Sequence, residues 1–171
     1  MTESISIDKN LSDVDIYNAV ILQMEYLLKS EEPIISNLSN VSALLKEAFC
    51  KISWVGFYLL KDNKLYLGPF QGKPACTVIN VGSGVCGASA QLIQTIIVDD
   101  VDSFPGHIAC DSDSKSEIVV PLIQNEKLCG VLDIDSHKYA SFNLHDKMYL
   151  EMICRTITEK LNFNYISEIL K

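Results

Sequence analysis

Two stretches of the chain each contain a strand pattern, a short polar turn and a second strand pattern. The first runs from Ile52 to Phe70 through ISWVGFYLL, KDNK and LYLGPF, and the second covers Ser116 to Ser136 with its turn at QNEK. Aromatic and β-branched runs on either side of a short polar turn are typical of β-hairpins. Because a hairpin pairs antiparallel strands, these stretches predict an antiparallel sheet.

Helical patterns flank this strand-rich region on both sides. Ser12 to Lys29 offers a capping serine, acidic residues in the first turn and one apolar stripe, which together predict a helix. A second helix is predicted around Leu38 to Cys50. Apolar residues recur at every fourth position from Tyr149 to Ile169, which predicts a final helix over residues 143–170. This order of elements indicates an α+β fold, with a central antiparallel sheet and flanking N- and C-terminal helices.

The segment between the two hairpins mixes short elements with loops. Residues 75–80 predict a third strand, residues 82–94 a short helix opened by glycines, and residues 95–99 another short strand. Residues 100–115 are a polar loop, and a loop of this length is more often functional than idle. Glycines that open a helix can present backbone N–H groups to an anion, here a carboxylate as easily as a phosphate. Without a Gly-Lys-Ser/Thr sequence, a nucleotide P-loop is rejected.

Length and charge restrict the organisation and the partners of the chain. Its 171 residues fit one domain over 1–171, with helices in 1–50, sheet and catalytic loops in 52–136, and the last helix in 143–170. A formal net charge of −8 without a Lys/Arg cluster argues against nucleic acid and anionic membrane as partners. There is neither an export signal nor an apolar run of about 20 residues, so we expect a cytoplasmic protein. A homodimer is left open.

Three of the six cysteines lie in the glycine- and proline-rich stretch from Gly68 to Asp111. Cys76 follows GKPA, Cys86 lies within GSGVCG, and Cys110 ends FPGHIAC. A reactive cysteine needs access and a thiolate-favouring environment, whereas a structural cysteine usually sits in an apolar run. In the cytosol a disulfide is more often transient and catalytic than structural. Three thiols on converging loops therefore indicate redox chemistry, and the others read as core thiols: Cys50, Cys129 and Cys154.

The last predicted strand carries two acidic residues on one face. Asp133 and Asp135 share that face with Val131 and Cys129, and Glu117 lies at the mouth of the adjoining strand. Two carboxylates on one face of a strand repel each other unless a cation or a shared proton compensates. The leading hypothesis is a site for a cationic group, either an organic ammonium or a metal. The alternative is a strand end that emerges into solvent.

Two further features leave alternatives open. Trp54, Gly56 and Tyr58 share one strand face, so the glycine either leaves a slot between two aromatics or marks a bulge in an ordinary core. His107 either supports the thiolate of Cys110 three residues later or is a solvated loop histidine. A zinc site built from His107 and the three loop cysteines would lack any Cys-x-x-Cys pair, so no metal is predicted.

Five motifs in succession, GPFQGKPAC, GVCG, FPGHIACD, SEIVVP and GVLDIDS, closely resemble those of the free methionine-R-sulfoxide reductases, which are built on a GAF domain. The resemblance is strong over Trp54 to Ser136 and weak over the terminal helices. It implies a single GAF-like domain that reduces free, not peptide-bound, methionine sulfoxide and prefers the R epimer. It also implies no bound cofactor, with thioredoxin, recycled by NADPH and thioredoxin reductase, as external reductant.

The same resemblance implies roles for individual residues. Cys110 is similar to the nucleophile, Cys76 to the main resolving cysteine and Cys86 to a second resolving cysteine. In such chemistry a thiolate attacks the sulfoxide sulfur and becomes a sulfenic acid, which a second thiol converts to a disulfide. A carboxylic acid protonates the oxygen. The residues implied to bind substrate are Trp54, Tyr58, Glu117, Asp133 and Asp135. The alternative is a non-catalytic GAF domain that senses a small ligand.

Overall fold

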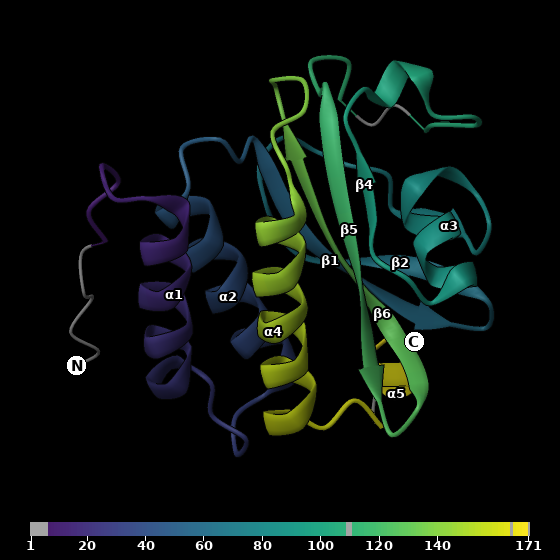
Figure 1. Ribbon diagram of the computed structural model, residues 1–171. Coiled ribbons are helices and arrows are strands. Elements are labelled where there is room, and N and C mark those ends of the chain that lie inside the picture. Colours follow the sequence, from purple (N-terminus) through teal and green to yellow (C-terminus); the bar gives the residue numbers. More distant parts are fainter. Residues whose placement is uncertain (1–6, 109–110, 165, 171) are drawn as a thin grey trace.

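One antiparallel sheet organises the protein, as a computed structural model that describes residues 7–108, 111–164 and 166–170 shows (Figure 1). Its six strands lie in the order β3-β2-β1-β6-β5-β4. Their bounds are β1 Trp54–Lys61, β2 Lys64–Gln71, β3 Val78–Asn80, β4 Ile96–Val98, β5 Ser116–Gln124 and β6 Lys127–Ser136. The predicted α+β architecture is confirmed, although β3 and β4 are shorter than the sequence patterns suggested.

Both predicted hairpins form, and tight turns explain why. Asp62 and Asn63 between β1 and β2, and Asn125 and Glu126 between β5 and β6, all have φ between 49° and 63°. Two successive residues with positive φ give the turn whose twist matches that of the flanking strands. The two hairpins then join through β1 and β6, whose pairing places Trp54 opposite Asp135.

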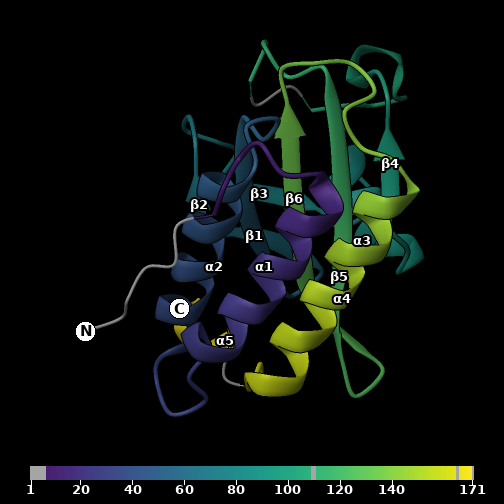
Figure 2. The same cartoon turned by 60° about the vertical axis from the view of Figure 1, so that its left-hand side comes forward.

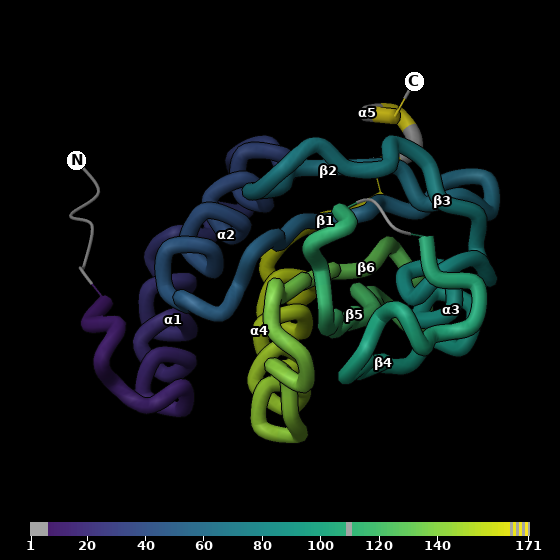
Figure 3. The backbone as a smooth tube through the Cα atoms, turned by 90° about the horizontal axis from the view of Figure 1, so that it is seen from above, coloured from purple at the N-terminus to yellow at the C-terminus, as the bar shows by residue number. Residues whose placement is uncertain are grey.

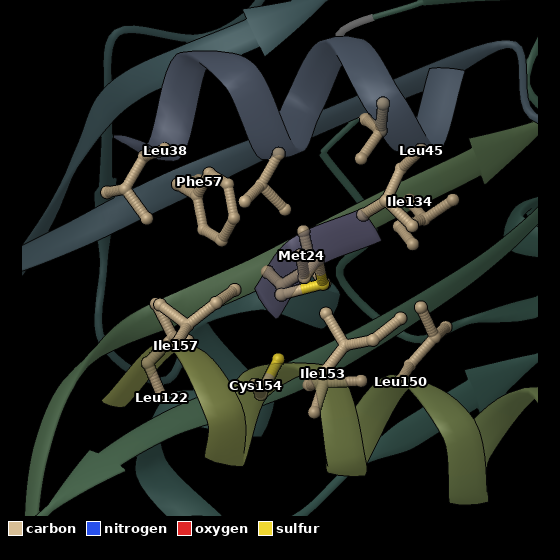
Figure 4. Close-up of a cluster of buried hydrophobic side chains, with 14 of the residues drawn as sticks. Met24, Leu38, Leu45, Phe57, Leu122, Ile134, Leu150, Ile153, Cys154 and Ile157 are labelled. Carbon is tan, nitrogen blue, oxygen red and sulfur yellow. The ribbon is translucent and has the colours of Figure 1, made fainter. Parts of the chain in front are cut away.

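Three long helices cover one face of the sheet. α1 (Asp13–Leu27), α2 (Ile34–Ala48) and α4 (Leu144–Lys160) lie side by side in front of the strands (Figure 2). Between them and the sheet lies the larger apolar core, where Met24 of α1 is surrounded by side chains from the other helices and strands (Figure 4). Residues 13–48 thus supply two of the three helices that cover this face. None of the described helices combines the length and the apolar character needed to cross a lipid bilayer.

The second helix begins four residues earlier than the sequence pattern predicted, directly after Pro33. The buried side chain of Asn37 explains this start. Its Oδ1 accepts the N–H of Lys29, and its Nδ2 donates to the carbonyl oxygens of Lys29 and Pro33. These bonds connect the chain after α1 to the first turn of α2, so residues 34–37 become helical.

The single helix predicted over 143–170 is wrong, because α4 ends at Lys160 and a short helix, α5 (Ile166–Ile169), follows. The interruption depends on Gln124 at the end of β5. Its Nε2 donates to the carbonyl of Leu161, which has extended backbone, and its Oε1 accepts the N–H of Phe163. The hairpin therefore ends α4 and turns Phe163 into the core.

A buried polar network joins α1 to α4. Asp146, in the first turn of α4, accepts a hydrogen bond from Tyr17 at 2.8 Å and pairs with Lys51 at 2.5 Å. Lys51 also pairs with Asp13 of α1 at 2.6 Å. Burial and the nearby Asp146 carboxylate raise the pKa of Tyr17, so its hydroxyl stays protonated and acts as a donor.

Candidate active site

A pocket lies on the opposite face of the sheet, against α3 (Gly84–Leu92). Figure 3, seen from above, places α3 on the side of the strands away from α1, α2 and α4. The pocket is open to solvent, and its space including the mouth is about 530 Å³. Its lining comes from β1, β5 and β6, the start of α3, and the loops near residues 75 and 107. Side chains that are far apart in the sequence therefore come together in this pocket.

The aromatic wall of the pocket is formed by Trp54 and Tyr58 of β1. Their ring centroids are 6.2 Å apart, and a Cβ added at Gly56 would lie 2.5 Å from the Trp54 ring. The predicted slot is therefore filled by the tryptophan, and the register shifts after Gly56 as a bulge would require. Trp54 Nε1 donates to the carbonyl of Lys73 and the Tyr58 hydroxyl donates to the carbonyl of Cys76, both at 3.0 Å. The aromatic wall thus also holds the loop that carries Cys76.

The three predicted acids gather on the floor of the pocket. Glu117 of β5 pairs across the sheet with Asp135 of β6, and Asp133 is the next residue on the same face. Glu117 is 6% and Asp133 7% exposed, which overturns the alternative of a solvated strand end. Val131 packs on this face, but Cys129 packs toward the other core because the β5–β6 register shifts beside it.

Burial dominates the electrostatics of these acids. It raises the pKa of Glu117 well above its usual value, with a further contribution from the charges of Asp133 and Asp135. It raises the pKa of Asp133 to about 6, and burial together with the Asp133 charge raises that of Asp135. Asp133 Oδ1 is buried without a hydrogen-bond partner among the described residues. No ion pair within that part of the chain joins the three acids to a lysine or arginine. The cluster can therefore accept protons or a cation.

Cys76 lies on a loop, as the sequence predicted, whereas Cys86 is not an accessible loop thiol. Cys86 lies in the first turn of α3 with 4% exposure, and its Sγ is 4.0 Å from Glu117 Oε1. Burial and the charges of Asp133 and Glu117 raise its pKa, so the thiol form is favoured. Cys76 is half-buried and disulfide-bonded. Cys110 lies outside the described residues. Among the expected core thiols, Cys154 is buried and Cys129 half-buried, whereas Cys50 is exposed.

His107 is not the solvated loop histidine that was the simpler prediction. Its side chain is 14% exposed, lines the pocket, and places Nε2 3.8 Å from Glu117 Oε2. Burial lowers its pKa, so the imidazole is neutral at pH 7. Any support that it gives to the Cys110 thiolate stays a prediction.

Sequence reasoning missed a group of ionic residues at the rim. Lys73 Nζ lies 3.0 Å from Asp111 and 2.7 Å from Asp113, and His137 Nε2 lies 3.3 Å from Asp111. The backbone N–H of Asp113 and the Lys73 ammonium lower the pKa of Asp111, which lines the pocket as a carboxylate. These pairs connect the Cys76 loop to the segment after Cys110. The sequence signals are Lys73, three residues before Cys76, and Asp111, directly after Cys110.

The glycine-led start of α3 faces the pocket, as the sequence predicted for an anion site. Ser83, Gly84 and Val85 all line it. Gly84 has φ of +60°, which favours glycine, and a Cβ at Gly87 would lie 2.4 Å from the carbonyl oxygen of Asn80. This close approach brings the helix start against the sheet, where its free N–H groups can meet an anion.

Comparison with known proteins agrees with this geometry. The GAF domain family model matches residues 33–161. The free methionine-R-sulfoxide reductase of Saccharomyces cerevisiae is 42% identical, and the match covers 94% of this chain and 94% of that protein. The free methionine-R-sulfoxide reductase of Escherichia coli is 46% identical, and the match covers 79% of this chain and 82% of that protein. The chain belongs to the free methionine-R-sulfoxide reductase family of GAF-domain proteins.

Solved structures extend the match within this family. The X-ray structure of free methionine-R-sulfoxide reductase from Neisseria meningitidis in complex with its substrate is 40% identical. It superposes with a TM-score of 0.85 and covers 96% of this chain and 98% of that chain. The family expectation of a GAF fold, drawn from five short motifs, is therefore confirmed over nearly the whole length.

Proposed function

We propose that this protein reduces free methionine (R)-S-oxide to methionine by cysteine chemistry. One observation carries the proposal: a pocket joins buried acids to an aromatic wall, and Tyr58 of that wall donates to the carbonyl of the disulfide-bonded Cys76. Relatives at 42% and 46% identity carry the name free methionine-R-sulfoxide reductase, which supports the same reaction and epimer. A cytoplasmic setting would supply the reductant that such a cycle needs.

The free amino acid fits the pocket at three points. The ammonium group pairs with the acids on the pocket floor, which form no ion pair with a lysine or arginine of the described residues. The carboxylate takes the N–H groups at the start of α3, and the methyl end lies against Trp54 and Tyr58. A peptide-bound residue has neither free charge, so it would leave two sets of polar groups desolvated and unpaired.

Two cysteine thiols supply the two electrons that reduce the sulfoxide. The Cys110 thiolate attacks the sulfoxide sulfur while a pocket carboxylic acid protonates the oxygen. The oxygen then moves from the substrate sulfur to Cys110 Sγ as the sulfur–sulfur bond made by the attack breaks, so methionine leaves and Cys110 becomes a sulfenic acid. The Cys76 thiol condenses with it, which releases water and forms a disulfide that an external dithiol, thioredoxin, reduces. Burial raises the pKa of Glu117 and favours its protonated form, which supports it as the acid.

Cys76 and Cys86 have different roles in this proposal. The disulfide-bonded state of Cys76 supports it as the main resolving cysteine. Cys86 is buried and its raised pKa favours the thiol, so it is a slow nucleophile and a second resolving cysteine.

The deciding assay couples NADPH oxidation through thioredoxin reductase and thioredoxin to reduction of free or N-acetylated methionine sulfoxide. We expect turnover with free methionine sulfoxide and none with the N-acetylated compound. Cys110→Ser should yield no methionine even in a single turnover, while Cys76→Ser should yield about one methionine per protein and then recycle slowly. Methionine formed by Cys110→Ser would refute the nucleophile.

A non-catalytic ligand sensor is the second candidate, because the same pocket would suit binding alone. Titration of free thiols in the reduced protein separates the two. Methionine sulfoxide should consume two thiols per reductase molecule, whereas a sensor would bind it with all thiols retained.

A further inference from the structure

The pocket floor combines nitrogen, sulfur and oxygen donors that no part of the proposed reaction needs together. One donor atom each of Cys86, Glu117 and Asp133 lies within 4.8 Å of the other two. His107 Nε2 adds a fourth donor, 3.8 Å from Glu117 Oε2. In a tetrahedral zinc site with bonds of about 2.0–2.3 Å, donor atoms are roughly 3.3–3.8 Å apart. Small side-chain rotations would therefore bring these groups into coordination distance.

Two observations independent of the spacing point to a cation. Asp133 Oδ1, on a side chain 7% exposed, faces the pocket without a hydrogen-bond partner among the described residues. The rim cluster of Asp111, Asp113 and His137 has a similar donor spacing, but Lys73 already pairs with both of its carboxylates. Within the described part of the chain, no lysine pairs with the acids of the floor. Burial instead raises the pKa of its carboxyl and thiol groups, so protons occupy the positions that a cation could take.

We propose that Cys86, Glu117, Asp133 and His107 form a binding site for a zinc-type divalent cation, which occupies the pocket in place of substrate. The donor set decides the class of metal. Thiolate and imidazole ligands suit Zn²⁺ or Cd²⁺, whereas Mg²⁺ and Ca²⁺ prefer oxygen ligands alone. Metal binding stands on the geometry alone. Its competition with methionine sulfoxide rests on the proposed function, in which the same acids take the substrate ammonium.

The test is a titration of the oxidised protein, in which Cys76 is disulfide-bonded, in a Cys50→Ser background that removes the exposed thiol. Cd²⁺ should produce one ultraviolet sulfur-to-metal charge-transfer band per protein. Zn²⁺, measured by competition with a chromophoric chelator, should displace Cd²⁺ and abolish the band, and Mg²⁺ should not.

Matched variants locate the site. Cys86→Ser should remove the band, and Glu117→Gln should weaken zinc binding about tenfold or more while the circular dichroism spectrum stays native. Two control variants change residues outside the site: Cys129→Ser removes a half-buried thiol elsewhere, and Asp113→Asn changes the rim cluster. Both should bind Cd²⁺ and Zn²⁺ as the parent protein does. A band that survives Cys86→Ser, or a zinc affinity that neither pocket variant changes, would overturn the site.

Methionine sulfoxide provides the final arm. It should lower the apparent zinc affinity in proportion to its concentration, and simultaneous binding of both would refute the competition. Because the titration needs no turnover, an inactive protein would contradict the proposed function while the band and its loss in Cys86→Ser still decide the metal site.

Discussion

Replacing Asp133 with asparagine should stabilise the ligand-free protein and impair the reaction at once. Asp133 is buried beside two other acids, and burial raises its pKa from 3.8 to about 6. A carboxyl group whose pKa is higher in the folded state favours folding below its unfolded pKa. That contribution is lost as the pH rises through the folded value. Above about pH 6, the Asp133 carboxylate therefore opposes folding.

The size of the effect follows from the two pKa values. Each pKa unit corresponds to about 1.4 kcal/mol, so the difference between 3.8 and about 6 amounts to roughly 3 kcal/mol at most. The asparagine amide still needs buried hydrogen bonds, which Glu117 and Cys86 can accept, so we expect about 1–3 kcal/mol. For a chain of this length that raises the melting temperature by roughly 2–10 °C.

Thermal unfolding of the apo protein at pH 8 and pH 4 tests the sign. Asp133→Asn should melt higher than the parent at pH 8, and the difference should largely vanish at pH 4. Glu32→Gln makes the same change at an exposed position and should alter neither value. In parallel, kcat/KM for free methionine sulfoxide should fall about ten- to a hundredfold through loss of a charge-assisted hydrogen bond. A melting temperature that Asp133→Asn leaves unchanged at pH 8 would refute the electrostatic argument, and an unchanged kcat/KM would refute the ammonium site.

Three further changes probe the structure around this site. Lys51→Met leaves Asp146 buried without its cation and should destabilise the protein by about 3–5 kcal/mol in urea unfolding, unlike Lys64→Met at the exposed first residue of β2. Lys73→Met removes the two rim ion pairs that Lys73 forms with Asp111 and Asp113. Quenched-flow analysis should then show an unchanged rate of methionine release, but a disulfide step that is about two- to fivefold slower and whose rate no longer depends on salt concentration. Gln124→Ala should speed amide hydrogen exchange in the last turn of α4 and cost about 1–3 kcal/mol.

Local sequence patterns predicted those parts of the fold that depend on near neighbours. The turn residues Asp62 and Asn63 specify a hairpin, and Ser12 accepts the N–H of Asp15 as the cap of α1. The alternation of Asp133 and Asp135 with apolar residues correctly placed both acids on one face. Such signals are readable because each involves residues only a few positions apart.

The predictions that failed depended on residues far away in the chain. α4 ends because Gln124 of a distant hairpin bonds the backbone after its last turn, and no local pattern contains that contact. His107 is half-buried because its loop folds over β5 beside Glu117.

By itself, the sequence determined the two hairpins, the packing helices, the motifs of the family and the chemical types in its pocket. Only the tertiary structure decided that Trp54 would face Asp135 across β1 and β6, and that Cys86 would be buried against the acids instead of lying on an accessible loop. The physical reason is that pKa values and reactivity depend on desolvation and on charges brought together by long-range pairing. These quantities exist only once the sheet has assembled.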